Sequence, residues 1–434
     1  MMFTNGRNSV RRAAGLVALL LCLATIAAAQ SGTFSMMQGY PIPTDSAFPA
    51  GIAAGPDGAL WFTESGSGNI GRITTAGVIT TYPIPTSGGQ PWSITSGPDG
   101  ALWFTENVAG NIGRITTDGV VTEYPVPTPR SGPLGITAGP DGALWFTETR
   151  ANQIGRITTA GTFTEYPANI PSGGDEGYPD YITAGPNGAL WFTWTNYGSG
   201  GAGQITTAGA VTLYPVPASY GGFSEVDGIT AGPDGALWFA DNAGNIWRIT
   251  TDGAITQYPV PLKPSGGGTG WITAAPDGAL WFTVSCSPCA NGWIGRITTA
   301  GVITEFPEPT SGGLGGIAAG SDGALWVTDT GFRLSIDSVI LRAPACALGL
   351  SASLTGTTLA TNFNLGIDTP ATWSIVLEHT IGLETPIHPV APPRAFTIDW
   401  NASRLTGNVL VTSELSNPSG QVLCAEWTTV DTGQ

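Results

Sequence analysis

Short apolar stretches alternate along this chain with turns that are rich in glycine, proline and aspartate. In one representative stretch, residues 93–96 and 101–105 flank Gly-Pro-Asp-Gly, and residues 111–116 and 120–125 flank Thr-Thr-Asp-Gly. Proline presets φ for such a turn and glycine accepts a positive φ. The flanking segments are rich in Ile, Thr, Val and aromatic residues, as strands are, and none has a sustained helical period. The pattern therefore predicts four short strands in about 42 residues.

The same stretch occurs seven times. The phrase Gly-Pro-Asp-Gly-Ala-Leu-Trp-Phe-Thr first begins at Gly55, and its tryptophan returns every 42 to 47 residues. These tryptophans are Trp61, Trp103, Trp145, Trp191, Trp238, Trp281 and Trp326. Four strands repeated at such a period are typical of a propeller blade, so we predict an all-β, seven-bladed β-propeller over residues 30–345.

The two ends of the repeat array predict how the ring closes. The seventh copy lacks the Tyr-Pro-x-Pro strand that ends the others, and that strand instead precedes the first copy at residues 40–43. We therefore expect the N-terminal strand to complete the seventh blade, because this removes an exposed sheet edge.

The loops are of two kinds. Because successive strands run in opposite directions, the two kinds lie on opposite faces of the predicted ring. The Gly-Pro-Asp-Gly and Thr-Thr-Ala/Asp-Gly turns are nearly identical in every copy. The remaining loops vary, notably at residues 166–181, 215–228 and 284–293. We expect the uniform face to be scaffold and the variable-loop face to carry function.

Two repeated residues have structural interpretations. The Trp of each phrase should fill the space between neighbouring sheets. A cation recurs in the Ile-Gly-Arg-Ile strand, and its even repetition predicts a tie between blades. The positions are Arg72, Arg114, Arg156, Arg248 and Arg296, with Gln204 in the fourth copy.

Carboxylates follow the Trp-Phe-Thr strand in five copies. They are Glu64, Glu106, Glu148, Asp241 and Asp329, and Trp194 and Val284 occupy the other two positions. Such a ring is a candidate site for a hard cation or a cationic ligand. The alternative is that each carboxylate pairs with a neighbouring Arg or a backbone N–H.

The positions two residues before the inner-strand Ile differ most between copies, and we call the end of the channel that they form the channel mouth. They are Ala50, Trp92, Leu134, Asp180, Asp227, Gly270 and Gly315. Asp180 and Asp227 add acidity there, and Trp92, Trp194 and Trp271 supply aromatic surface. These five residues are the predicted ligand-binding set, and the alternative is that some of them only cover strand ends.

Residues 1–29 have the pattern of a secretory signal peptide, with three arginines before an apolar run that ends in Ala-Ala-Ala. The remaining chain carries 12 basic and 31 acidic residues, which disfavours nucleic acid and anionic lipid as partners. No later stretch is apolar enough to span a bilayer. We expect a secreted or periplasmic monomer that binds a small molecule, peptide or glycan.

Residues 346–434 lack the repeat and alternate apolar with polar residues, which predicts a small β-sandwich-like domain. Four cysteines follow the signal segment, and an even number in an exported chain predicts disulfides. Of three possible pairings we favour Cys286–Cys289 and Cys346–Cys424, since each stays within one unit.

The repeat resembles the virginiamycin B lyase (streptogramin lyase) family. The resemblance covers residues 34–342 and is carried by Ile136-Thr-Ala-Gly-Pro-Asp-Gly-Ala-Leu-Trp-Phe-Thr-Glu148, by Ile154-Gly-Arg-Ile-Thr-Thr159 and by Thr164-Glu-Tyr-Pro167. It implies a seven-bladed propeller. It also implies Mg²⁺-dependent elimination at the ester C–O bond of cyclic depsipeptide antibiotics, without hydrolysis.

The family's catalytic positions are not matched. The lyases have His two residues before the inner-strand Ile in their last two repeats, where this chain has Gly270 and Gly315. Val284 replaces the sixth-repeat Glu, and Asp329 or Thr330 is nearest to the last acidic residue. The only histidines, His379 and His388, lie beyond the propeller, so no Ser-His-Asp or Cys-His site is expected within it.

Three functions follow as hypotheses. The first is a ligand-binding propeller without lyase activity, in which the mouth takes the ligand and a divalent cation could assist. The second is a Mg²⁺-dependent C–O lyase that uses Asp180, Asp227 and Asp329. The third is a metal-dependent, lactonase-like hydrolase.

Overall fold

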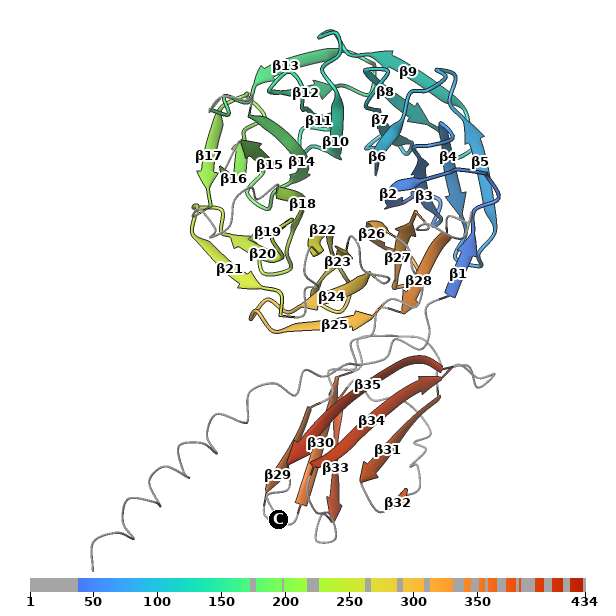
Figure 1. Ribbon diagram of the computed structural model, residues 1–434, viewed down its shortest axis with the longest axis vertical. Coiled ribbons are helices and arrows are strands. Elements are labelled where there is room, and N and C mark those ends of the chain that lie inside the picture. The colour runs from blue at the N-terminus through green and yellow to red at the C-terminus, as the bar shows by residue number, and fades with distance from the viewer. Residues whose placement is uncertain are drawn as a thin grey trace, which may run out of the picture.

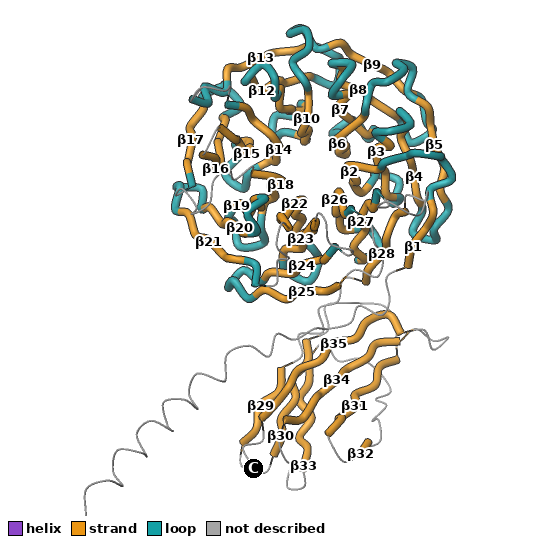
Figure 2. Tube along the Cα trace, viewed as in Figure 1, coloured by secondary structure: helices purple, strands orange, loops and turns teal. Residues whose placement is uncertain are grey.

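The computed structural model describes residues 38–171, 177–196, 199–216, 226–261, 267–286, 292–307, 313–330 and 339–344, together with the backbone of strands between residues 351 and 431. All the described elements are strands, and turns and loops connect them (Figure 2). Figure 1 shows seven sheets arranged as the blades of a ring, which confirms the predicted all-β propeller.

Six blades are antiparallel sheets of four strands that are consecutive in the chain. Blade 1 contains β2 (Pro49–Ala54), β3 (Leu60–Glu64), β4 (Asn69–Ile73) and β5 (Ile79–Pro83). Blade 2 contains β6 (Pro91–Ser96), β7 (Leu102–Glu106), β8 (Asn111–Ile115) and β9 (Val121–Pro125). Blade 3 contains β10 (Pro133–Ala138), β11 (Leu144–Glu148), β12 (Gln153–Ile157) and β13 (Phe163–Pro167).

The next three blades have the same order from the channel outward. Blade 4 contains β14 (Tyr178–Ala184), β15 (Leu190–Asn196), β16 (Ser199–Ile205) and β17 (Val211–Pro215). Blade 5 contains β18 (Val226–Ala231), β19 (Leu237–Asp241), β20 (Asn245–Ile249) and β21 (Ile255–Pro259). Blade 6 contains β22 (Gly267–Ala274), β23 (Leu280–Cys286), β24 (Trp293–Ile297) and β25 (Ile303–Pro307).

Blade 7 joins the two ends of the repeat array. Its strands are β26 (Leu314–Ala319), β27 (Ala324–Asp329), β28 (Val339–Pro344) and, as the outer strand, β1 (Gln38–Pro41). In the antiparallel register of β1 and β28, Tyr40 lies opposite Ile340. The expected closure by the N-terminal strand is confirmed.

The tryptophans of the repeated phrase form the core between blades. All seven are at most 1% exposed. Trp61 packs with Ile94 and Leu102 of the next blade, and Trp326 of blade 7 packs with Phe62 of blade 1. Their structural interpretation is therefore confirmed, and the same contact closes the ring.

A hydroxyl on the second strand joins neighbouring inner strands. The Thr63 hydroxyl donates a 2.8 Å hydrogen bond to the carbonyl of Trp92 in blade 2. At the closure, Thr328 makes the same 2.8 Å bond to the carbonyl of Ala50. These bonds satisfy carbonyls that face the preceding blade instead of a strand of their own sheet.

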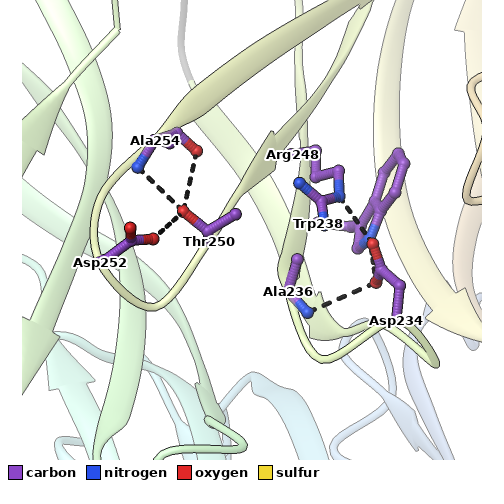
Figure 3. A network of polar contacts seen from close by, with 7 residues as sticks. All are labelled: Asp234, Ala236, Trp238, Arg248, Thr250, Asp252 and Ala254. Atoms are coloured by element: carbon purple, nitrogen blue, oxygen red, sulfur yellow. Dashed lines mark hydrogen bonds and ion pairs between the residues drawn. The ribbon is translucent and has the colours of Figure 1, made fainter.

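The repeated arginine ties strands within one blade, so the expectation of a tie between blades is wrong. In blade 5, Asp234 accepts a 2.6 Å ion pair from Arg248 and a 3.0 Å bond from the Trp238 indole (Figure 3). Arg248 also lies 5.9 Å from the Trp238 ring centre. In six of the seven blades, the aspartate of the turn between the inner and second strands thus holds the third strand of its own sheet.

The turn between the third and outer strands of blade 5 has its own polar contacts. The Thr250 hydroxyl bonds to Asp252 and accepts a 3.0 Å bond from the backbone N–H of Ala254 (Figure 3). Gly253 adopts a φ of 95°, which a residue with a side chain rarely adopts. These contacts explain why the Thr-Thr-Ala/Asp-Gly turns vary so little.

Beyond the propeller, the described strands form two antiparallel sheets. One contains β29 (Ser351–Thr355), β30 (Thr358–Asn364) and β33 (Ala395–Asn401). The other contains β31 (Thr372–His379), β32 (Gly382–Leu383), β34 (Asn408–Ser416) and β35 (Val422–Asp431). The sandwich packing of the two sheets stays a prediction.

Candidate functional site at the channel mouth

Three aromatic side chains from alternate blades meet at the channel mouth. They come from β6, β14 and β22, which Figure 1 shows on different sides of the ring centre. The Trp92 indole N–H donates a 3.2 Å hydrogen bond to the Tyr181 hydroxyl. The Tyr181 and Trp271 rings meet edge to face, with centroids 4.7 Å apart. Residues 92, 181 and 271 thus form one aromatic cluster across the channel.

A bulge at the start of each inner strand positions these side chains. The register of β14 with β15 shifts between Pro179 and Ile182, and that of β22 shifts between Thr269 and Ile272. A bulge adds a residue to one strand and re-aims the side chains beside it. Second-strand hydroxyls hold the bulges, because the N–H of Tyr181 bonds to Thr193 and that of Trp271 bonds to Thr283.

The residue just before the inner-strand Ile is normally small, since the neighbouring inner strand approaches closely. A Cβ at Gly135 would lie 2.8 Å from the Cα of Tyr181, and one at Gly228 would lie 3.0 Å from the Cα of Trp271. Five blades have Gly or Ser at this position, at Gly51, Ser93, Gly135, Gly228 and Gly316. Tyr181 and Trp271 are the two exceptions.

Tyr181 was missed by the sequence analysis, which named Trp92 and Trp271 of this cluster. The signal was available in the same comparison of repeats, one position further along. Two large aromatic residues at a site otherwise restricted to Gly and Ser must project away from the neighbouring strand. The structure brings both to the channel mouth.

Two of the predicted carboxylates flank the cluster. Asp180 precedes Tyr181 on β14, and its Oδ2 accepts a 3.0 Å bond from Thr195. Asp227 is on β18, which packs between β14 and β22. Burial raises the pKa of Tyr181, and the negative charge of Asp227 adds to this effect, so the phenol stays neutral. Both aspartates are half-buried and keep the mouth acidic.

The carboxylates at the ends of the second strands lie inside the blades rather than in an open ring. Glu64, Glu106, Glu148, Asp241 and Asp329 are each at most 1% exposed. Glu64 accepts bonds of 2.8 Å from Ser67 and 3.0 Å from Asn69. Asp241 accepts bonds from Asn245 and a 2.7 Å bond from the Trp247 indole. Hydrogen bonds within the blade thus hold Asp241 and one oxygen of Glu64, whose Oε1 has no hydrogen-bond partner among the described residues.

Two of these buried glutamates have strongly perturbed acidity. Burial raises the pKa of Glu106 to about 7, with Glu123 contributing, although Asn111 donates a 3.2 Å bond to it. Burial likewise raises the pKa of Glu148 to about 7, with Glu165 nearby. The nearby Ser131 hydroxyl lowers the pKa of Glu148 and so offsets part of this rise, although the two side chains do not form a hydrogen bond.

Trp194 belongs to the core and not to the ligand-binding surface predicted for it. It is 3% exposed, packs with Trp145 and Phe192, and donates a 2.9 Å bond to the carbonyl of Ala202. Val284, at the equivalent position of blade 6, is fully buried. Cys289 and Cys346, and the side chains of Cys286 and Cys424, lie outside the described residues, so the disulfides stay predictions.

The Mg²⁺ that the resemblance implies finds no preformed cage in the described part of the chain. Nowhere in that part do three or more His, Cys, Asp or Glu side chains come together. Asp180 and Asp227 at the mouth are a pair of carboxylates, which falls short of the oxygen ligands that a dedicated site supplies. The described residues also include no helix of the length and hydrophobicity that crossing a bilayer requires.

Comparison with known proteins identifies the propeller. The family model described as "Virginiamycin B lyase family" matches residues 28–174 and 169–334. A solved virginiamycin B lyase from Staphylococcus aureus is 37% identical, with a TM-score of 0.62 over 71% of this chain and 99% of that chain. A streptogramin B lyase structure is 34% identical, with a TM-score of 0.61 over 70% and 97% of the two chains.

A third solved structure contains a ligand. It is a catalytically inactive histidine-to-alanine variant of the S. aureus lyase with quinupristin, 36% identical, with a TM-score of 0.62 over 71% of this chain and 99% of that chain. Among curated protein sequences, none gives a significant match. The matched residues and the identities show that this chain belongs to the virginiamycin B lyase family.

Proposed function

We propose that this chain is an exported propeller that binds a ligand at the channel mouth and does not open streptogramin rings. The contact of Trp92, Tyr181 and Trp271 across the channel is the observation that carries the proposal. Aromatic surface beside a few polar groups is the usual composition of a small-molecule site. The signal-peptide pattern of residues 1–29 supports export.

The ligand class follows from the family and the cluster together. Quinupristin, found with the inactive S. aureus variant, is the reference ligand. Trp92, Tyr181 and Trp271 offer rigid apolar surface, and Asp180 and Asp227 offer hydrogen-bond acceptors beside it. This combination suits a compact peptide-like or other amphipathic molecule.

Loss of lyase activity is proposed because this chain has no proton-transfer group in the family's place. Glycine stands at positions 270 and 315, and both histidines of the chain lie beyond the propeller. In the S. aureus lyase, a single histidine-to-alanine change gives a protein described as catalytically inactive. Tyr181 is a poor base at neutral pH since its pKa is raised, which leaves Asp180 and Asp227 as the groups at the mouth able to accept a proton.

Titration calorimetry with quinupristin tests the binding, using the full chain and Trp271→Leu. We expect measurable binding that weakens at least about tenfold in the variant, since aromatic anchors carry much of the energy of such sites. Trp293→Leu is the control, because Trp293 is half-buried on the third strand of the same blade and not on its inner strand. Equal binding by the chain and the Trp271 variant would refute this site.

A turnover assay on quinupristin, with Mg²⁺ or with EDTA, separates the remaining functions. The S. aureus lyase serves as the positive control. Elimination gives a linear product of unchanged mass and shifted chromatographic retention, whereas hydrolysis adds the mass of one water. We expect neither product. Metal-dependent elimination would establish the C–O lyase alternative, and hydrolysis would establish the lactonase-like alternative.

A further inference from the structure

We propose that the channel mouth selects an organic cation, such as a substituted ammonium group, carried by its ligand. The inference rests on the proposed binding function and specifies the charge of the group that enters the aromatic cluster. Three aromatic rings and two carboxylates at this end of the channel support it.

The aromatic cluster supplies the first part of the recognition. Trp92, Tyr181 and Trp271 are each partly exposed at the mouth. Aromatic faces carry negative charge density and attract cations, tryptophan most strongly. The hydrogen bond from Trp92 to Tyr181 and the edge contact of Tyr181 with Trp271 hold the rings in place.

The two carboxylates supply the second part. Asp180 directly precedes Tyr181 on β14, and Asp227 is on β18, which packs against both β14 and β22. Asp180 also accepts a 3.0 Å hydrogen bond from Thr195. Two negative charges beside aromatic faces disfavour an anionic ligand and favour a cation.

The side chains at the mouth are better suited to an organic cation than to a metal ion. Ca²⁺ and Mg²⁺ require six or more oxygen ligands, and indole rings supply none. A substituted ammonium is weakly hydrated and exchanges water for aromatic surface at low cost. The formal net charge of −16 also raises the local concentration of any cation at the mouth.

The test compares benzyltrimethylammonium with its neutral isostere, neopentylbenzene, by titration calorimetry on the full chain. We expect the cation to bind and the isostere to bind at least about tenfold more weakly, as expected from a desolvated cation–π contact beside two carboxylates. Asp227→Asn should weaken binding of the cation by about tenfold and leave binding of the isostere unchanged. Asp118→Asn, on an exposed turn of the uniform face, is the matched control and should change neither.

Each outcome bears on one proposal or on both. Equal affinity for the cation and the isostere, or an unchanged affinity in Asp227→Asn, overturns the cation inference. If the cation fails while quinupristin still binds in a Trp271-dependent manner, only the inference falls. If the cation binds through Asp227 while quinupristin does not, the inference holds and the peptide-like ligand falls. If neither binds, both fall.

Discussion

Glu64, Glu106 and Glu148 occupy the same position in three repeats, yet their partners differ. Ser67 and Asn69 both donate to Glu64, whereas Asn111 donates to Glu106, which also lies beside Glu123. A second carboxylate lies near Glu106 and near Glu148, and the pKa of each is raised to about 7. A buried carboxyl in this situation prefers to keep its proton, because ionisation there is unfavourable.

This predicts an unusual pH dependence of stability. In the unfolded chain these carboxyls titrate near 4.5, and in the folded chain near 7. The folded state therefore binds protons more tightly, and its stabilisation is complete below pH 4.5 and lost as the pH rises to 7. We expect the free energy of unfolding from urea titrations to fall over this range, by up to about 3 kcal/mol per group.

The double variant Glu106→Gln/Glu148→Gln should flatten that fall and be more stable than the unsubstituted chain at pH 8. Asp118→Asn is the control, since Asp118 is exposed and should leave the profile unchanged. An undiminished fall in the double variant would mean that other groups cause it.

At the scale of the elements, each blade is held by its inner turn. Asp141 accepts a 2.7 Å ion pair from Arg156 of the third strand and a 3.0 Å bond from Trp145 of the second. Burial alone would raise the pKa of Asp141, but these donors outweigh it and lower that pKa. Blade 4 replaces the pair with Asn187 and Gln204, and Asn187 still accepts a 3.1 Å bond from Trp191. Both charges are lost together, so neither is left unpaired.

The Asp141–Arg156 pair of blade 3 can be replaced by the Asn and Gln that blade 4 has at the same positions. Arg156→Gln alone should cost about 1 kcal/mol, because it leaves the partly buried Asp141 without its cation. Adding Asp141→Asn should recover part of that cost. Urea denaturation of the two single variants and the double variant measures the coupling, and strictly additive effects would contradict it.

The closest approach between inner strands predicts where a methyl group is not tolerated. A Cβ at Gly316 would lie 2.7 Å from the backbone carbonyl of Ala50, whereas one at Gly270 would lie 3.2 Å from the Thr283 hydroxyl. A backbone group on the neighbouring blade cannot move aside as a hydroxyl can. Gly316→Ala should therefore destabilise the fold by about 2 kcal/mol or more, and Gly270→Ala by less. Thermal melting of the two variants measures this, and equal losses would argue against it.

For the whole molecule, stability depends on closing the ring. The outer strand of blade 7 comes from the start of the described chain, and Tyr40 stacks on Trp326 with ring centroids 5.8 Å apart. The other six blades have outer strands that follow directly in sequence. Closure is therefore the one step of blade assembly that joins distant segments.

Deleting residues 30–41 should leave the edge of β28 unpaired and remove the ring that covers Trp326. We expect a lower melting temperature and self-association detectable by light scattering, because an unpaired strand edge is a template for other chains. Tyr40→Phe keeps the strand and the stacking ring and should remain monomeric. A truncated chain that melts like the full chain would show that closure contributes little.

The sequence alone determined the number of blades, the strands within them, the turns and the closure by the N-terminal strand. Each depends on residues close in the chain, or on a period that each copy repeats, so comparing the copies was enough. Gly-Pro-Asp-Gly, for example, specifies the turn before each Trp wherever it occurs. The acidity of the mouth was also predicted from the sequence, since Asp180 and Asp227 are at positions that vary between copies.

Only the tertiary structure decided which side chains meet. Trp92 and Tyr181 are 89 residues apart on alternate blades, and no period in the sequence relates them. The partner of the repeated arginine and the burial of Glu64, Trp194 and Asp241 also required the structure. Ring closure brings together strands that are not neighbours in the chain, and contacts across a channel depend on that geometry rather than on any local pattern.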